Sequence, residues 1–227
     1  MSEIINTPPT QADRITEEER LLLELRSHAS SFFREMSYYK CAMLEVETKF
    51  RVLSEDFSYR HDRNPIESVR SRLKSPESII EKIKRRGLPL SLQSVEENLF
   101  DVAGVRVICG FVDDVYALAD SFLGQDDVRL VVKKDYIKKP KENGYRSLHL
   151  VVEIPIFLFE EKKYMKVEIQ MRTIAMDFWA SLEHQMRYKK DDSRITEGIR
   201  AELYECAAMS AELDGRMNDL RIKILGD

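Results

Sequence analysis

Two carboxylates stand where the sequence predicts buried or half-buried β-strands. Asp101 precedes the segment 102–111, which is almost entirely apolar, and Glu168 lies within the segment 163–172. Arg106 interrupts the first apolar run, and an arginine buried without an anion is very costly. Two interpretations stay open. Either Arg106 forms a structural ion pair with one carboxylate, or Asp101 and Glu168 hold a magnesium ion that binds phosphates, since Mg²⁺ prefers a few hard oxygen ligands.

The strand expected at 163–172 has two different faces. Its polar residues alternate with apolar ones, so side chains of one kind point to one side of a sheet. Such a polar face is either an ordinary solvated surface or the floor of a cleft that carries a carboxylate. The polar residues are Lys166, Glu168, Gln170 and Arg172.

A first cluster of cations lies between positions 70 and 86. On the helix expected there, Lys82 and Arg85 share one face. In an extended segment, Arg72 and Lys74 share one side because they are two residues apart. A run of charge is either a solvated surface or, in this setting, a clamp for a triphosphate. The cations are Arg70, Arg72, Lys74, Lys82, Lys84, Arg85 and Arg86.

A second basic cluster lies between two expected strands and contains aromatic residues. Tyr136 and Tyr145 are interleaved with its cations, and Asn143-Gly144 forms a turn signal. The segment is either a plain hairpin connection with solubilising lysines or a loop that binds a nucleotide, with phosphates on lysine and a base stacked on tyrosine. The cations are Lys133, Lys134, Lys138, Lys139, Lys141 and Arg146.

One sheet must bring these groups together. We expect strands at 102–111, 128–132, 147–154 and 163–172, and helices at 76–86, 113–123 and 173–190, with a further short helix that opens at Asn64-Pro65. Strands interleaved with helices predict an α+β fold, a mixed sheet of about five strands with flanking helices. Two carboxylates, two basic clusters and a stacking aromatic around such a sheet suit phosphoryl-type transfer between two nucleotides, which depends on positioning and electrostatic stabilisation.

Long helices are expected at both ends of the chain. Thr16 and Glu19 form a capping-box pattern, and apolar residues then recur at heptad spacing from Leu22 to Phe57. A second heptad series runs from Ile199 to Ile224. Both seams need a partner, which is the other helix, the core or another subunit. The expected division is a flexible tail at 1–15, a domain at 16–190 that includes the N-terminal helices, and a C-terminal packing or oligomerisation helix at 191–227.

Composition excludes several classes of protein. The net charge is −4 and the pI is about 5.7, which argues against a dedicated nucleic-acid binder. The three cysteines are far apart, so neither a disulfide framework nor a zinc site is expected. We expect no membrane-spanning segment and no signal peptide, and therefore a cytoplasmic protein.

Three long motifs resemble those of a known family. Residues 100–109 (FDVAGVRVIC) resemble its D-[IV]-A-G-x-R strand, and residues 141–149 (KENGYRSLH) resemble its K-x-N-G-Y-[RQ]-S-[LI]-H loop. Residues 167–173 (VEIQMRT) resemble its [VA]-E-[IV]-Q-[IVM]-R-T strand, and residues 176–184 (MDFWASLEH) the helix that follows. The chain resembles the small alarmone synthetases, stand-alone relatives of the long Rel-type (p)ppGpp synthetases, over about residues 64–190.

The resemblance implies a nucleotidyltransferase-like fold and a reaction. The 3′-hydroxyl of GDP or GTP attacks the β-phosphorus of ATP, which gives ppGpp or pppGpp and AMP. Asp101 and Glu168 would hold Mg²⁺, and Glu168 would also accept the hydroxyl proton. The resemblance places Arg72, Lys74, Lys82, Arg85 and Arg106 around ATP, with Arg106 also catalytic, and it places Lys141, Tyr145, His149 and Gln170 on the guanine-nucleotide side, with Tyr145 stacked on guanine.

Some properties of the family are not expected here. The long relatives carry a hydrolase domain with a His-Asp pair, and we interpret His61-Asp62 as loop because too few residues precede Asn64 for that domain. Synthesis alone is therefore expected. The short relatives imply a homo-oligomer, most simply a tetramer, while an allosteric nucleotide or RNA as a further partner stays open. The alternatives are a transferase of whole nucleotides, which usually carries an Asp-x-Asp pair that is missing here, an RNA-binding module, and a degenerate synthase.

Overall fold

The computed structural model describes residues 17–60, 63–187 and 196–225 of the chain. The predicted tail, Thr16 and the His61-Asp62 pair lie outside the described residues. The chain divides into two compact units, 1–37 and 38–227, and the long helix α1 (Glu17–Arg60) contributes to both. The first unit contains the start of α1, where Phe32 and Phe33 meet edge to face. The second contains the sheet, and the predicted division at 15 and 190 stays a prediction.

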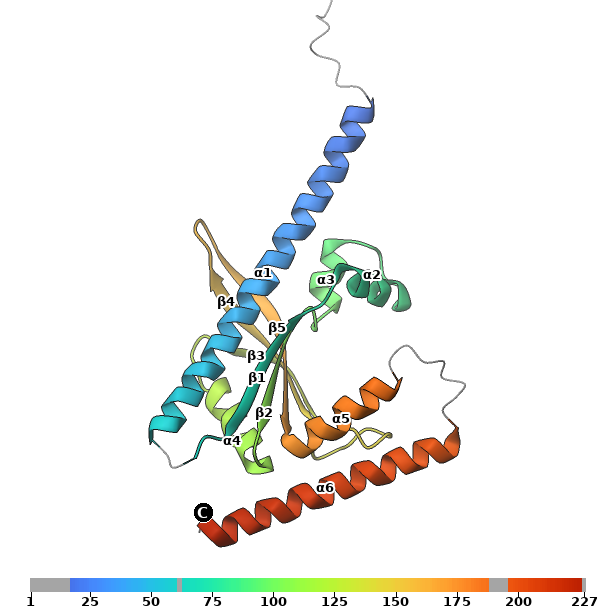
Figure 1. Ribbon diagram of the computed structural model, residues 1–227. Helices are drawn as coiled ribbons and strands as arrows, with labels where there is room; N and C mark the ends of the chain where they lie inside the picture. Colours follow the sequence, from blue (N-terminus) through green and yellow to red (C-terminus); the bar gives the residue numbers. More distant parts are fainter. Residues whose placement is uncertain (1–16, 61–62, 188–195, 226–227) are drawn as a thin grey trace, which may run out of the picture. The chain divides into compact units, whose positions relative to one another are not determined.

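A mixed five-stranded sheet forms the centre of the second unit, as the sequence predicted (Figure 1). Its order is β1-β2-β5-β4-β3, with β2 and β5 parallel and the other neighbours antiparallel. Parallel pairing of β2 and β5 brings the two strands that carry the family motifs side by side at the middle of the sheet. The strands are β1 (Ile66–Leu73), β2 (Ala103–Cys109), β3 (Arg129–Asp135), β4 (Leu148–Phe157) and β5 (Lys162–Thr173).

The segment after Asn64-Pro65 is strand β1, so the helix predicted there is wrong. A residue before proline is disfavoured in the helical region. The Asn64 side chain accepts a hydrogen bond from the Ile66 amide at 2.9 Å, which starts the strand with a local turn instead of a helix. β1 then pairs antiparallel with β2. The extended geometry expected for Arg72 and Lys74 is therefore present at the end of β1.

The other predicted helices are present, with one addition. Helix α2 (Pro76–Arg85) has Pro at its start and Ser75 as its N-cap, and Gly87 follows its end with a φ of 66°. Helices α4 (Val112–Leu123) and α5 (Ile174–Arg187) follow strands β2 and β5. Helix α3 (Leu92–Asn98) was not predicted, and its N-cap is Ser91. None of the helices, over the residues described, is long and apolar enough to cross a membrane.

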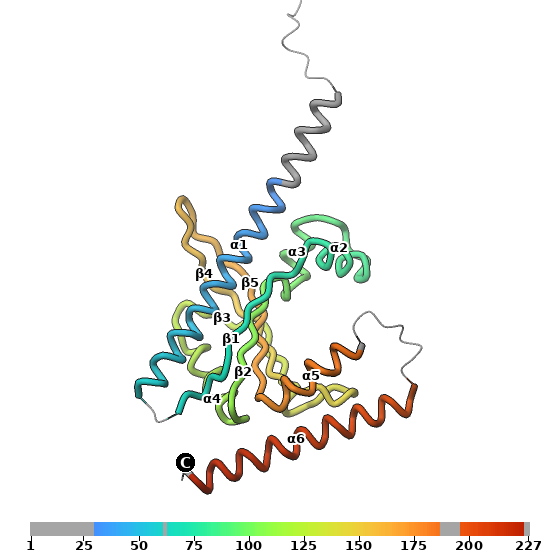
Figure 2. Tube along the Cα trace, viewed as in Figure 1, coloured from blue at the N-terminus to red at the C-terminus, as the bar shows by residue number. Residues whose placement is uncertain are grey.

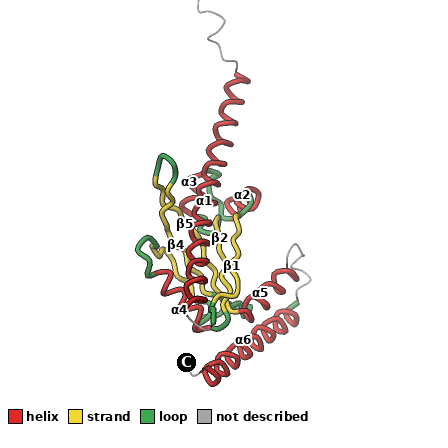
Figure 3. Tube along the Cα trace, turned by 60° about the vertical axis from the view of Figure 1, so that its left-hand side comes forward, coloured by secondary structure: helices red, strands yellow, loops and turns green. Residues whose placement is uncertain are grey.

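The heptad seam of α1 packs on the core within the second unit. Tyr39, Met43, Val46 and Phe50 are buried, and the Phe50 ring stacks on Phe122 of α4 with 4.5 Å between centroids. This contact places α1 beside α4, where Figure 3 shows α1 running past the yellow strands. The seam from Tyr39 onward thus finds its partner in the core.

Helix α6 (Glu197–Leu225) does not bury its predicted heptad seam, whose partner the sequence left open, against the rest of the second unit. It runs beside α5 in the opposite direction (Figure 2), and its buried face is small and polar instead of apolar. Ala207 and Asp214 are buried there, while Ser210 donates a hydrogen bond to the Ala175 carbonyl at 3.0 Å. Most of the predicted heptad residues face outward because the polar stripe meets the backbone and side chains of α5 and β5. The exposed apolar residues include Met209, Leu213, Met217, Leu220 and Ile224.

Candidate active site

Two rows of side chains cross the sheet on one face, since residues paired across neighbouring strands project to the same side. The first row is Arg70, Arg106, Gln170 and His149. The second row, two residues along each strand, is Arg72, Gly104 and Glu168. Gly104 contributes no side chain, so the space between its two neighbours stays open.

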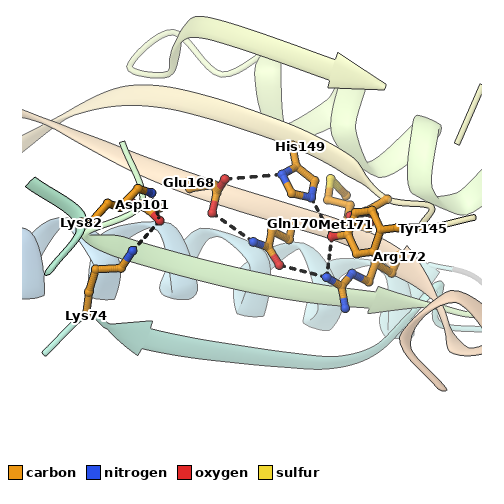
Figure 4. Close-up of polar contacts among 10 residues, drawn as sticks. Lys74, Lys82, Asp101, Tyr145, His149, Glu168, Gln170, Met171 and Arg172 are labelled. Carbon is orange, nitrogen blue, oxygen red and sulfur yellow. Dashed lines mark hydrogen bonds and ion pairs between the residues drawn. The ribbon is translucent and has the colours of Figure 1, made fainter. Parts of the chain in front are cut away.

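Asp101 lies at the entrance to β2 and accepts hydrogen bonds from two lysines (Figure 4). Lys74 and Lys82 both place Nζ 2.5 Å from its Oδ2. Burial alone would raise the pKa of Asp101, but the bonds from Lys74 and Lys82 outweigh burial and lower it. The pKa of Lys82 is lowered as well, by burial first and then by the charges of Lys74 and Arg86, against the opposite effect of Asp101. Asp101 is therefore a charged group at neutral pH, in a basic surrounding.

Glu168 lies on β5 between two polar neighbours. Gln170 donates to its Oε2 at 3.0 Å, and His149 Nδ1 lies 3.4 Å from its Oε1. Burial raises the pKa of Glu168, and the charge of Asp101 adds to this, but the contacts of His149 and then Gln170 reverse the direction and lower it. The effect of Asp101 shows that the two carboxylates are close enough to interact electrostatically.

Tyr145 continues the chain of contacts from Glu168 toward Arg172. Arg172 Nη2 donates to the Tyr145 hydroxyl at 2.6 Å, and this hydroxyl lies 2.8 Å from His149 Nε2. The Tyr145 hydroxyl therefore links Arg172 to His149. The Arg172 guanidinium and the Lys141 ammonium also lie 5.0 and 4.8 Å from the ring centroid. Figure 4 shows Glu168, His149, Tyr145 and Arg172 following one another along β5.

Arg106 pairs with Asp177 and with neither Asp101 nor Glu168, so the structural ion pair, one of the two interpretations that the sequence left open, does not form among the described residues. Its Nη1 lies 3.3 Å from Oδ1 of Asp177 on α5, an atom that also accepts from Arg172 at 3.1 Å. Asp101 is five residues away along an extended chain, about 16 Å at the usual rise per residue. Burial first, and then the charge of Arg172, lower the pKa of Arg106. A single carboxylate shared by two guanidiniums leaves this side of the site electropositive.

A pocket of about 680 Å³ opens over these rows. Strands β1, β2 and β5 form its floor, and α5 forms one wall. The predicted residues that line it are Arg72, Lys74, Asp101, Arg106, Tyr145, Glu168 and Gln170. Four predicted residues do not line it. Lys82 contacts the lining residue Asp101, and His149 contacts the lining residues Glu168 and Tyr145. Lys141 lies over the ring of Tyr145. Arg85 is exposed on α2, outside the pocket.

The two carboxylates fit a magnesium ion that shares its ligands with phosphates. Oδ1 of Asp101 is buried and has no hydrogen-bond partner among the described residues, so one carboxylate oxygen is available. No group of three or more His, Cys, Asp or Glu side chains suited to a metal occurs in the part of the chain that is described. Mg²⁺ usually binds through one or two carboxylates and substrate phosphates, which matches a pair of this kind.

Sequence reasoning missed the part of the pocket that comes from α5. Asp177 forms ion pairs with both Arg106 and Arg172. In the sequence it was only an acidic residue in the first turn of a helix. Ser181 and His184 are three residues apart on that helix and reach the pocket together, as this spacing predicts. Other lining residues that were not singled out for the site are Ser71, Ser78, Glu183 and Gln185.

Comparison with known proteins agrees with this geometry. GTP pyrophosphokinase YwaC of Bacillus subtilis is 41% identical over 201 residues, which are 88% of this chain and 95% of that protein. The crystal structure of small alarmone synthetase 1 from Bacillus subtilis bound to its product pppGpp superposes with a TM-score of 0.78 at 36% identity, covering 86% of this chain and 98% of that one. The same synthetase bound to AMPCPP superposes with a TM-score of 0.72 at 31% identity, covering 87% and 100%.

The family match covers the strands and helix that build the pocket. The family described as "Region found in RelA / SpoT proteins" matches residues 71–193, which include Asp101, Tyr145 and Glu168. With a relative at 41% identity over nearly its whole length, the match is not confined to a motif. The chain belongs to the RelA/SpoT family of (p)ppGpp synthetases.

Proposed function

We propose that this chain is a GTP pyrophosphokinase that only synthesises alarmone. It transfers the β,γ-pyrophosphate of ATP to the 3′-hydroxyl of GDP or GTP. The observation that carries the proposal is the pocket, in which Asp101 and Glu168 lie between cations on one side and Tyr145 on the other. A triphosphate needs the cations, an attacking hydroxyl needs a carboxylate, and a purine needs an aromatic surface. The names of the relatives support the same reaction.

The donor side of the pocket is the basic end of β1 and β2. Arg72, Lys74 and Arg106 face the space over the sheet, and we assign them to the phosphates of ATP. Arg106 shares Asp177 with Arg172, so a phosphate would supply the negative charge that its surroundings lack. Lys82 acts through Asp101. Arg85 is assigned to ATP only as a residue at the mouth of the site, since it is exposed on α2.

The acceptor side lies along β5 and the loop before β4. The 3′-oxygen forms a bond to the β-phosphorus, the bond from that phosphorus to the oxygen of the α-phosphate breaks, and AMP leaves. Glu168 accepts the proton of the hydroxyl, since its pKa is lowered and it is ionised at neutral pH. A guanine that stacks on Tyr145 replaces one of the two cations over the ring, Lys141 or Arg172. The cation replaced is Lys141, because it is exposed and Arg172 is buried. His149 and Gln170 hold Glu168 in place.

We assign the metal to magnesium, held by Asp101 and Glu168. When bound there, it neutralises the charge that develops on the transferred phosphates. Each of the two carboxylates keeps its own orientation without the metal, Asp101 through its lysines and Glu168 through Gln170 and His149. A cytoplasmic location stays a prediction.

The test is turnover with ATP, GDP and magnesium, followed by anion-exchange chromatography. A product more anionic than GTP, formed with an equal amount of AMP, is expected. Glu168→Gln keeps the shape of the side chain and removes the base, so activity should fall by at least about 100-fold. Glu160→Gln, on an exposed turn between β4 and β5, is the matched control and should leave activity unchanged. Wild-type activity in Glu168→Gln, or release of pyrophosphate instead of AMP, would contradict the proposal.

We also propose that the protein is a homo-oligomer, in keeping with the predicted tetramer. The observation that supports it is the outer face of α6. Met209, Leu213 and Met217 are each about half exposed along it (61%, 58% and 49%), and apolar rows of this length usually mark a contact surface. Light scattering should give a mass above that of a monomer, and Leu213→Glu should lower it. A monomeric wild type would refute this proposal and leave the reaction untouched.

A further inference from the structure

Helix α6 lies directly against the loop that carries Tyr145. Gly144 has a φ of 84°, a conformation that L side chains rarely adopt, and a Cβ placed there would lie 2.5 Å from Cβ of Ala207. The turn is closed by a hydrogen bond from the Gly144 amide to the Lys141 carbonyl at 2.8 Å. The backbone next to Tyr145 therefore packs directly on Ala207 and Tyr204 of α6, with no room for a side chain between Gly144 and Ala207.

The ring of Tyr145 itself rests on a small apolar cluster that α5 and α6 share. Trp179 and Ala180 of α5 are buried with Ala207 of α6, and Tyr145 packs against them. Trp179 also donates its indole N–H to the Leu203 carbonyl at 3.1 Å. The cluster exists only while α6 is docked, because one of its buried members and the indole acceptor both belong to α6.

Asp214 of α6 contacts Arg146 and Thr173, the residues next in sequence to Tyr145 and Arg172. It is 4% exposed, and its Oδ2 accepts from Thr173 Oγ1 at 2.8 Å. The same oxygen lies 3.8 Å from Nη1 of Arg146. Arg146 follows Tyr145 in the chain and Thr173 follows Arg172. Asp214 therefore ties the acceptor loop and the end of β5 to a single point on α6.

Neither Ala207 nor Asp214 lines the pocket. We propose that α6 is a positioning element for the acceptor nucleotide: Ala207 and Asp214 fix the loop so that Tyr145 is presented to the guanine base. This inference rests on the proposed role of Tyr145. It makes these two residues determinants of guanine-nucleotide affinity although they touch no substrate. It predicts no effect on ATP affinity, since Lys74 and Asp101 lie at the opposite end of the row of residues from Tyr145 (Figure 4).

The test compares two pairs of matched variants. Ala207→Val and Asp214→Asn disturb the contacts with the loop, while Ala208→Val and Glu212→Gln make the same chemical changes at exposed positions of the same helix. The readouts are the Kd for GDP by calorimetry, the KM values for GDP and ATP, and the fluorescence of Trp179, the single tryptophan of the chain. Ala207→Gly, which removes the contact without strain, serves as a further variant if Ala207→Val does not fold.

Ala207→Val and Asp214→Asn should each raise both the Kd and the KM for GDP by about five- to tenfold. This is a part of the binding energy that one base–aromatic stack provides. They should leave the KM for ATP within about twofold and shift the Trp179 emission, while both control variants behave as wild type. An equal rise in both KM values, or unchanged GDP binding together with a shifted Trp179 emission, would overturn the inference. A wild-type protein that binds GDP but shows no turnover would refute the proposed function alone. The Kd values of wild type and variants for GDP would still test the role of α6.

Discussion

Asp101 has a structural task beside its proposed catalytic one, and Asp101→Asn should separate the two. The carboxylate is the common partner of Lys74 and Lys82, whose side chains are only 18% and 17% exposed. An amide would leave two cations facing each other across a neutral group. We therefore expect the variant to lose stability as well as turnover, whereas Glu168→Gln should lose turnover alone because an amide oxygen can still accept the hydrogen bond from Gln170.

The size of the loss follows from the two contacts. A hydrogen bond to a charged group contributes about 1.5–3 kcal/mol, and breaking a buried ion pair costs about 3–5 kcal/mol. Asp101 is 24% exposed, so water screens part of this and the lysines can turn toward solvent. A loss of about 2 kcal/mol is expected, which lowers Tm by about 4–8 °C for a chain of this size.

Urea denaturation of a double-mutant cycle measures this contribution. Lys82→Met removes one of the stranded cations, so Asp101→Asn combined with Lys82→Met should be more stable than the sum of the single changes predicts. Activity should stay absent in the double variant, since the proposed metal ligand is still missing. Wild-type stability of Asp101→Asn, or strict additivity in the cycle, would refute the reasoning.

Three further predictions concern other parts of the site and the fold. Tyr145→Ser should raise the KM for GDP by about tenfold or more and leave the KM for ATP nearly unchanged, and equal effects in steady-state kinetics would refute its stacking role. Chelation by EDTA should abolish turnover, and excess Mg²⁺ should restore it, whereas activity that survives chelation would exclude the metal. The hydrogen bond from Ser71, and next that from Arg51, lower the pKa of Glu47. A lowered pKa stabilises the fold above the unfolded value of about 4.3 and ceases to do so as pH falls through the native one. In urea titrations, Glu47→Gln should therefore cost about 1 kcal/mol at pH 7. The cost should shrink as pH falls through the native pKa of Glu47, and a cost that does not change with pH would contradict this.

The sequence was most informative where a pattern is local. Alternation along β5 placed Glu168 and Gln170 on one face, and the capping residues around α2 marked both of its ends. It was wrong at Asn64-Pro65, because a proline near the start of a segment suits either a helix or a strand. Pairing of the following residues with β2 decided for the strand.

The partners of charged residues could not be read from the sequence. One of the two interpretations of Arg106 was an ion pair with Asp101 or Glu168, yet Arg106 meets Asp177, which is 71 residues away. His149 had no pattern of its own, and only the register of β4 on β5 places it between Tyr145 and Glu168. Such contacts depend on strand order and on which helix end lies above which strand. Neither of these produces a periodic pattern in the sequence.

By itself, the sequence determined four of the five strands, the family and the chemical character of the site, since these depend on residue type and short spacing. The tertiary structure decided which cation meets which carboxylate, how Gly104 leaves the pocket open, and which face of α6 is buried. The last case shows the reason most clearly. Heptad spacing predicts a helix with an apolar seam, but the surface that covers α6 here offers hydrogen-bonding groups of α5 and β5, so its polar stripe turns inward.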